Sequence, residues 1–357
     1  MPSVAERPVD RAEAFAGRIM QVLDAGATSM MLSVGHRLGL FDAMAGMPPA
    51  TSEQVAQVAN LSERYVREWL AVMVTSGIVI YEPRTGHYHL PAEHADCLTR
   101  DARLGNLAVY GQMVALMGVV QDRIIECFRS GAGTTYDDYP GFHHCMAEDS
   151  GQTVTAQLFD TLLPMVPGLA ARLESGIEVL DAGCGRGSAL LAMAQRFPAS
   201  RFVGIDLCAD AIDHARCRAD ELKLANVAFV ARDLTGFAEP DRFDFITSFD
   251  AVHDQGDPQG LVRSLRDALR PGGVYLMQDI GGSARLENNR DFPFAAFLYA
   301  ISTCHCTPVS IGQGGAGLGT MWGWETAEAL LKESGFASVE RHVLPHDPMN
   351  VWFVSKA

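Results

Sequence analysis

A chain of 357 residues is long enough for two domains, and an apolar fraction of 48% supplies material for two hydrophobic cores. The formal net charge of −15 disfavours nonspecific binding to nucleic acid or to an anionic membrane. No apolar run approaches the length of a membrane span, and residues 1–11 lack the apolar stretch of a secretory signal, so we expect a cytoplasmic protein. The eight cysteines form no CxxC pair, which favours small buried side chains over a disulfide framework.

Residues 1–100 predict a winged-helix domain. Apolar residues at helical spacing fill 23–40. A helix is expected over 53–59, and after a turn at 60–62 a second helix should end near Gly77. Short strands over 78–81 and 87–90 flank a turn of hairpin composition. The order of two helices joined by a turn and then a hairpin is typical of a winged helix.

Residues 101–173 predict a helical linker and lid between two domains. Their middle, 131–142, is an interruption rich in Gly and Tyr.

Residues 174–357 alternate strands with helices, which predicts an α/β domain with a parallel sheet covered by helices on both faces. The last two strands, 338–344 and 350–355, are separated by only five residues. That connection is too short for a parallel crossover, so these strands should be antiparallel.

A glycine-rich turn, DAGCGRGS at residues 181–188, joins the first strand of this domain to a helix. Its glycines permit positive φ and a close approach of the backbone to a ligand, and the following helix N-terminus favours an anion. Ser188 stands where a dinucleotide site prefers a third glycine. The alternative is a tight strand-to-helix connection without a ligand.

This turn resembles the first motif of class I S-adenosylmethionine (SAM)-dependent methyltransferases. Three later segments match the motifs of the same family in order and spacing: VGIDL at 203–207, FDFITSFD at 243–250, which matches the fourth strand, and LRPGG at 269–273. The resemblance covers about residues 177–357 and implies a Rossmann-like class I methyltransferase sheet that binds SAM.

The resemblance implies a set of cofactor-binding residues. Asp181, Gly183, Cys184 and Gly185 would face the methionine moiety, Asp206 the ribose hydroxyls, and Leu207, Arg232, Asp233 and Leu234 the adenine, with Phe249 and Tyr136 completing the site. For Asp206 and Asp233, a helix N-cap and a solvated loop residue are the respective alternatives.

Methyl transfer requires that the acceptor be aligned and in some cases deprotonated. His253 follows the fourth strand and is the first candidate for the general base, with Asp254 as a second base or as the group that orients His253. A packing role for His253 is the alternative.

The insert between the fifth strand and the last helix is rich in aromatic residues and glycine, which suggests a mobile cover over a small apolar or aromatic acceptor. Phe297, His305 and Trp322 are the candidate pocket residues. Phe297 on a helix face packed in a core is the alternative. The spacing Cys304-His305-Cys306 is not a usual zinc pattern, and no metal site is predicted.

The first 100 residues contain eight Arg, no Lys and eleven Asp or Glu, a formal net charge of −3, and the arginines of the candidate recognition helix are flanked by Glu63 and Glu68. DNA-binding domains usually carry a basic stripe. The segment instead resembles the dimerisation domain of small-molecule O-methyltransferases, which implies a homodimer through the N-terminal domain. The expected function is therefore SAM-dependent methylation of a small molecule, at oxygen in preference to nitrogen, carbon or sulfur. A SAM-sensing winged-helix transcriptional regulator is the alternative, and a nicotinamide-dependent dehydrogenase is a more distant one.

Overall fold

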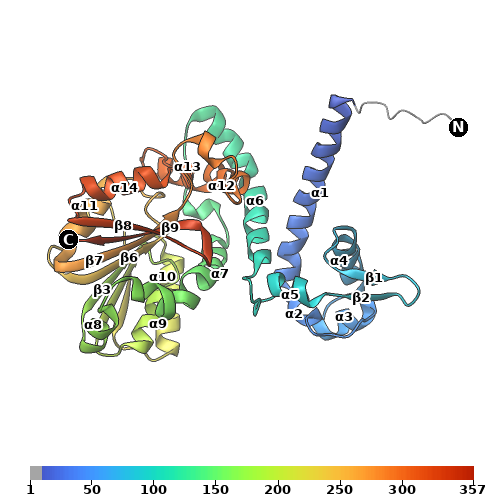
Figure 1. Ribbon diagram of the computed structural model, residues 1–357, viewed down its shortest axis with the longest axis horizontal. Helices are drawn as coiled ribbons and strands as arrows, with labels where there is room; N and C mark the ends of the chain where they lie inside the picture. The colour runs from blue at the N-terminus through green and yellow to red at the C-terminus, as the bar shows by residue number, and fades with distance from the viewer. Residues whose placement is uncertain (1–9) are drawn as a thin grey trace. The chain divides into compact units, whose positions relative to one another are not determined.

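The computed structural model describes residues 10–357 and divides the chain into two compact units, 1–115 and 116–357 (Figure 1). The division lies beyond the expected boundary at residue 100 because the segment that follows Arg100 still belongs to the first core. Ala108, in a short 3-10 helix over Leu107–Val109, is fully buried in that core.

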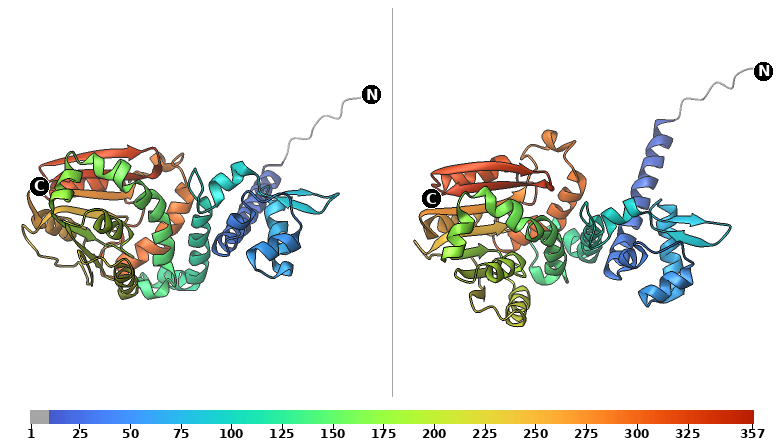
Figure 2. Two further views of the ribbon diagram at one scale, coloured as in Figure 1. Left: turned by 90° about the horizontal axis from the view of Figure 1, so that it is seen from below. Right: turned by 60° about the horizontal axis from the view of Figure 1, so that its bottom comes forward.

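The first unit contains five α-helices and one hairpin within its described residues. They are α1 (Arg11–Arg37), α2 (Leu40–Met44), α3 (Ser52–Ala59), α4 (Glu63–Thr75), β1 (Ile80–Glu82), β2 (His87–His89) and α5 (Ala92–Leu98). Thr51 caps α3 in a reciprocal capping box with Gln54, as its position in the sequence predicts. Figures 1 and 2 show the β1–β2 hairpin extending beyond the short helices, which is the wing of a winged helix.

The core of the first unit forms where α1, α2 and α4 meet. The rings of Phe41 and Trp69 pack edge to face with centroids 5.2 Å apart, and the Trp69 indole donates to the backbone carbonyl of Met31. A Cβ on Gly35 would lie 2.6 Å from the Trp69 ring, so α1 approaches this pair closely only because it has glycine there.

The second unit is an α/β domain. Its strands are β3 (Glu178–Ala182), β4 (Arg201–Asp206), β5 (Val227–Ala231), β6 (Phe243–Phe249), β7 (Leu269–Ile280), β8 (Ser338–Leu344) and β9 (Asp347–Lys356). Its α-helices are α7 (Phe142–Thr153), α8 (Leu169–Ser175), α9 (Ser188–Arg196), α10 (Ala209–Glu221), α11 (Pro258–Ala268), α12 (Ala295–Ile301), α13 (Thr307–Gly312) and α14 (Trp324–Glu333), and α6 (Tyr110–Ser130) contains the division between the units.

The seven strands form one sheet in the order β5-β4-β3-β6-β7-β9-β8. The first five are parallel, and β9 inserts antiparallel between β7 and β8. The sheet therefore confirms the predicted fold: a Rossmann-like parallel sheet that ends in an antiparallel strand.

Alternate residues of each strand point to opposite faces of the sheet, and each face has its own core. Val179, Phe245 and Trp352 pack under α8, α9 and α10, whereas their neighbours in sequence, such as Leu180 and Ile246, pack under α11 and α14. Figures 1 and 2 show these two helix layers on either side of the strands.

Among residues 10–357, no single helix has both the length and the apolar composition needed to cross a membrane. One pair of helical segments, Phe142–Met165 and Leu169–Ser175, is long and apolar enough only when both segments are counted together, and they meet at a bend of 106°.

Candidate active site

A cleft opens at the carboxyl ends of β3, β4 and β6. The order of the sheet reverses here, because β4 and β5 lie on one side of β3 while β6 and β7 lie on the other. Ligands of open α/β sheets bind at such a switch point. Residues of α7 and Tyr136 form the opposite wall of the cleft.

The glycine-rich turn lies at the floor of the cleft. β3 ends at Ala182, and Gly183 follows with φ of 78° and so little space that a Cβ would lie 2.5 Å from the Cβ of Ala251. Gly187, at φ of 73°, leads into α9, whose first two residues, Ser188 and Ala189, line the cleft. The turn thus has the left-handed geometry that the glycines predicted.

Asp206 ends β4 at the edge of the cleft and is held by the backbone. Its two carboxylate oxygens accept from the N–H of Gly185 at 2.8 Å and of Cys208 at 2.9 Å. Each oxygen keeps a further lone pair for a ligand hydroxyl. These bonds orient the carboxylate toward the cleft and join two of the motifs.

Asp181 is buried below the turn and lines the cleft. Burial raises the pKa of its carboxyl to about 7, the Thr247 hydroxyl that donates to it at 2.8 Å opposes this rise, and nearby Asp206 adds to it. A cation beside Asp181 would favour its ionised form.

Most of the predicted cofactor residues share this cleft. Those that line it are Tyr136, Asp181, Gly183, Cys184, Gly185, Asp206, Leu207, Asp233, Leu234 and Phe249. Arg232 does not line it, since its guanidinium pairs with Glu239 and lies over the ring of Phe237.

His253 lies next to the cleft between two carboxylates. Its Nδ1 is 2.8 Å from Asp279 Oδ1, and its Nε2 is 3.4 Å from Asp254 Oδ1. Burial disfavours the imidazolium, but the charges of Asp279 and Asp254 outweigh it and raise the pKa of His253 well above 6.5. Asp254 lines the cleft and accepts from the Tyr136 hydroxyl at 3.3 Å, whereas His253 is not part of the lining.

The three predicted acceptor-pocket residues lie outside the lining of the cleft. His305 is buried and stacks on Phe142 with centroids 3.9 Å apart, and burial lowers its pKa to about 4. Trp322 is buried and donates to Asp279 at 2.9 Å. Phe297 is half-buried against Phe294.

His305 belongs to a π-helical turn, Ser302–Cys306, between α12 and α13. Such turns are rare and often occur at functional sites. This one buries His305 and Cys306 beside Asp254, where Thr320 donates to the Cys306 sulfur.

Three residues of the site were not singled out as site residues from the sequence. Asp279 is the second-to-last residue of β7 and orients His253, and only its place near the end of a strand could have indicated it. Asp250 has φ of 49°, and one buried carboxyl oxygen has no hydrogen-bond partner; burial, with Asp279 nearby, raises its pKa. Arg186, inside the glycine-rich turn, lines the cleft with a buried Nε that also has no partner.

Two family models match separate parts of the chain. Residues 26–100 match a Rv2258c-like winged HTH domain, and residues 173–314 match a methyltransferase domain. The chain carries a winged helix and a methyltransferase domain. The glycine-rich turn and the strands β3 to β7 lie within residues 173–314, whereas β8, β9 and the α7 wall of the cleft lie outside this match.

Solved structures match the fold of this chain over nearly its whole length, although their sequence identity to it is low. A putative O-methyltransferase from Nostoc punctiforme superposes with a TM-score of 0.69 at 18% identity over 96% of this chain and 98% of that one. Human N-acetylserotonin methyltransferase in complex with SAM gives 0.66 at 17% identity over 100% and 99% of the two chains. At this identity the similarity establishes the fold.

Among curated proteins, (S)-coclaurine N-methyltransferase of Papaver somniferum is 27% identical over 110 residues, 31% of each chain. The chain spans between 31% and 49% of the length of the first curated relatives it matches. These matches therefore support the methyltransferase domain and leave the acceptor to be inferred from the site.

Proposed function

We propose that this protein transfers a methyl group from SAM to a hydroxyl of a small apolar or aromatic acceptor. The observation that carries the proposal is the buried Asp279–His253 pair beside a cleft that has the SAM-site motifs on its other wall.

The residues of the cleft fit the parts of SAM. Asp206 would accept from the ribose hydroxyls, while Leu207, Asp233 and Leu234 would surround the adenine. The unpartnered Nε of Arg186 and the N-terminus of α9 would hold the carboxylate of the methionine moiety. When bound, SAM supplies an electrophilic methyl on a cationic sulfonium, a charge that suits the acidic cleft.

His253 would accept the proton of the acceptor hydroxyl at Nε2. Asp279 holds Nδ1 at 2.8 Å, which fixes the tautomer with Nδ1 protonated and stabilises the imidazolium that forms. Asp254 Oδ1 lies 3.4 Å from Nε2 and is the closest described carboxylate on that side. An acceptor must therefore displace Asp254 from Nε2 as it enters.

The acceptor side of the cleft is covered by aromatic rings. Tyr136, Phe142 and His305 pack with centroids 3.9 to 5.8 Å apart, and Tyr139 also packs against His305. Such a cover favours a flat, apolar acceptor and excludes water from the reacting atoms.

Dimerisation through α1 follows from its exposed face. Phe15, Ile19, Val22, Leu23 and Met30 are exposed and lie at the helical spacing of one stripe. A second copy that pairs with this stripe would bury it. Leu23→Glu should shift the protein to monomer in light-scattering chromatography, whereas Gln21→Glu, which adds the same charge on the opposite side of α1, should leave the dimer intact.

DNA binding by the winged helix has little support. Within α4, Arg64 pairs with Glu68, and Arg67 lies 3.2 Å from Glu63, so the arginines of this helix are already neutralised. The regulator alternative predicts DNA retention that is lost in Arg64→Ala plus Arg67→Ala; the enzyme proposal predicts methyl transfer unchanged in the same variant. We place the activity in the cytoplasm.

The decisive experiment is native mass spectrometry with and without S-adenosylhomocysteine. We expect one cofactor mass per chain, lost in Asp206→Ala and retained in Asp213→Ala, which removes an exposed carboxylate of α10. Uptake of NAD instead, or of neither ligand, would refute the proposal.

A further inference from the structure

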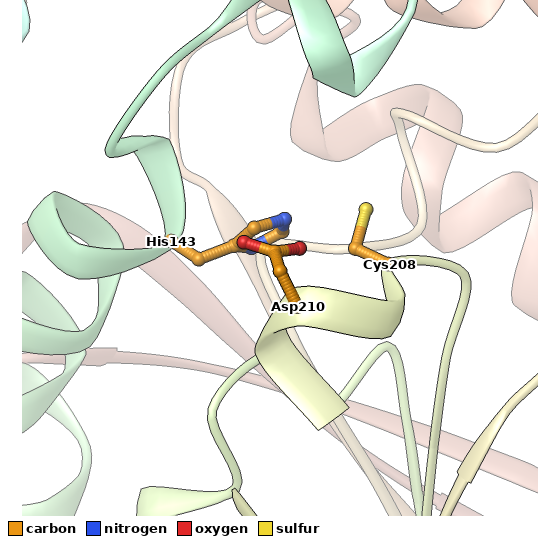
Figure 3. A group of neighbouring side chains, drawn as sticks. All are labelled: His143, Cys208 and Asp210. Carbon is orange, nitrogen blue, oxygen red and sulfur yellow. The ribbon is translucent and has the colours of Figure 1, made fainter. Parts of the chain in front are cut away.

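A second group of side chains lies at the rim of the cleft. His143 is in the first turn of α7, Cys208 directly precedes α10, and Asp210 is in the first turn of α10. One nitrogen, one sulfur and one carboxylate oxygen of these residues all lie within 4.8 Å of one another. Figure 3 shows His143 reaching from its helix toward the two residues at the start of α10.

The donor set suits a transition-metal ion. Imidazole, thiolate and carboxylate are the ligands of zinc, whereas magnesium and calcium prefer oxygen alone. His143 Nε2, one of its two possible ligand atoms, is buried and has no hydrogen-bond partner in the described structure. The ring stacks on Tyr136 with centroids 5.5 Å apart, which limits its orientation.

The electrostatic environment also favours a cation. The carboxylates of Asp206, Asp210 and Asp137 act electrostatically on the position of Cys208. The negative field that opposes a thiolate stabilises a divalent cation in the same place, and a bound cation offsets the charge of the thiolate. Binding would release the thiol proton to solvent.

We propose that His143, Cys208 and Asp210 bind one zinc-type ion, with a fourth position left for water. The ion joins α7, which lines one wall of the cleft, to the start of α10 at its rim. Sequence patterns do not reveal this site because Cys208 and Asp210 are 65 or more residues beyond His143.

Two of the proposed ligands, Cys208 and His143, couple the ion to the cofactor cleft. The Cys208 N–H donates to Asp206 Oδ1 at 2.9 Å, and His143 lines the same cleft. Metal and S-adenosylhomocysteine should therefore change each other's affinity by the same factor. Metal uptake requires no methyl transfer, so a test of metal binding is independent of the proposed activity.

The test is a cobalt titration of the metal-free full-length protein. We expect one Co²⁺ per chain with thiolate-to-cobalt charge-transfer absorption. Cys208→Ser should abolish this absorption, and His143→Gln, at a less buried position, should weaken Co²⁺ affinity at least about tenfold. His144→Gln and Cys217→Ser, exposed neighbours on α7 and α10, should bind as the wild type does.

Three results would overturn the proposal: no charge-transfer absorption, absorption that persists in Cys208→Ser, or absorption that is lost in Cys306→Ser instead. The last would assign the ion to the buried group of His253, Asp254 and Cys306, whose ligand atoms also lie within 4.8 Å of one another. Far-UV circular dichroism of each variant checks that the fold is retained.

Discussion

Replacing Asp279 by Asn tests the charge that the structure places behind His253. Asp279 is fully buried, and its Oδ1 accepts from His253 Nδ1, from the Trp322 indole and from the Ile280 N–H, at 2.8 to 2.9 Å. The substitution keeps the size of the side chain and removes its charge.

The expected shift follows from the lost charge of the hydrogen-bond acceptor. A hydrogen bond to a charged group contributes about 1.5–3 kcal/mol. Because one pKa unit corresponds to about 1.36 kcal/mol, the pKa of His253 should fall by about 1–2 units in Asp279→Asn. Because His253 acts as a base only when it is neutral, its pKa sets the ascending limb of the pH profile of kcat/KM. This limb should therefore move to lower pH in Asp279→Asn.

The effect on stability has a defined sign. The pKa of His253 is raised by folding, so its contribution to the free energy of unfolding is fully present below pH 6.5 and is lost as pH rises through the folded pKa. Asp279→Asn should therefore be most destabilised relative to wild type below pH 6.5. A pH-independent cost of about 1–3 kcal/mol remains, because Asp279 Oδ2 has no partner and the new amide group would be buried there unpaired.

Long-range proton–nitrogen NMR of the histidine rings measures the pKa without an acceptor, with His253→Gln to assign the signal. Asp347→Asn is the matched control, since Asp347 is equally buried and also accepts from an indole, that of Trp352. A wild-type His253 that titrates at or below pH 6.5, or an equal pKa in wild type and Asp279→Asn, would refute the reasoning.

Three further substitutions test other parts of the structure. Gly187→Ala places a Cβ on a residue in the left-handed conformation, where it overlaps the ring of Phe229. The melting temperature should fall by an amount equivalent to more than about 1–2 kcal/mol, and S-adenosylhomocysteine should bind more weakly. Phe41→Ala removes a fully buried ring from the first core and should cost about 3–5 kcal/mol in chemical denaturation; a smaller loss would mean that the core closes around the gap. Arg64→Ala breaks a solvent-exposed pair and should change stability by no more than about 0.5 kcal/mol in the same assay.

The sequence alone determined the architecture of this protein. The alternation of strands with helices predicted the sheet, and the strand Ser338–Leu344 has the expected bounds. The glycine-rich turn and Asp206 were visible because backbone geometry requires glycine at fixed positions and because carboxyl ends of parallel strands meet at one edge. These are local constraints, and a local pattern is sufficient to reveal them.

The chemistry beside His253 was decided only by the tertiary structure. The partner of His253 is Asp279, 26 residues away on β7. Its neighbour across the site, Cys306, lies in a π-helical turn that no local pattern predicted. Phe297, His305 and Trp322 have the aromatic character expected of a pocket, but they do not line the cleft. Whether an aromatic side chain borders a cavity or fills a core depends on what packs against it, and those neighbours come from distant parts of the chain.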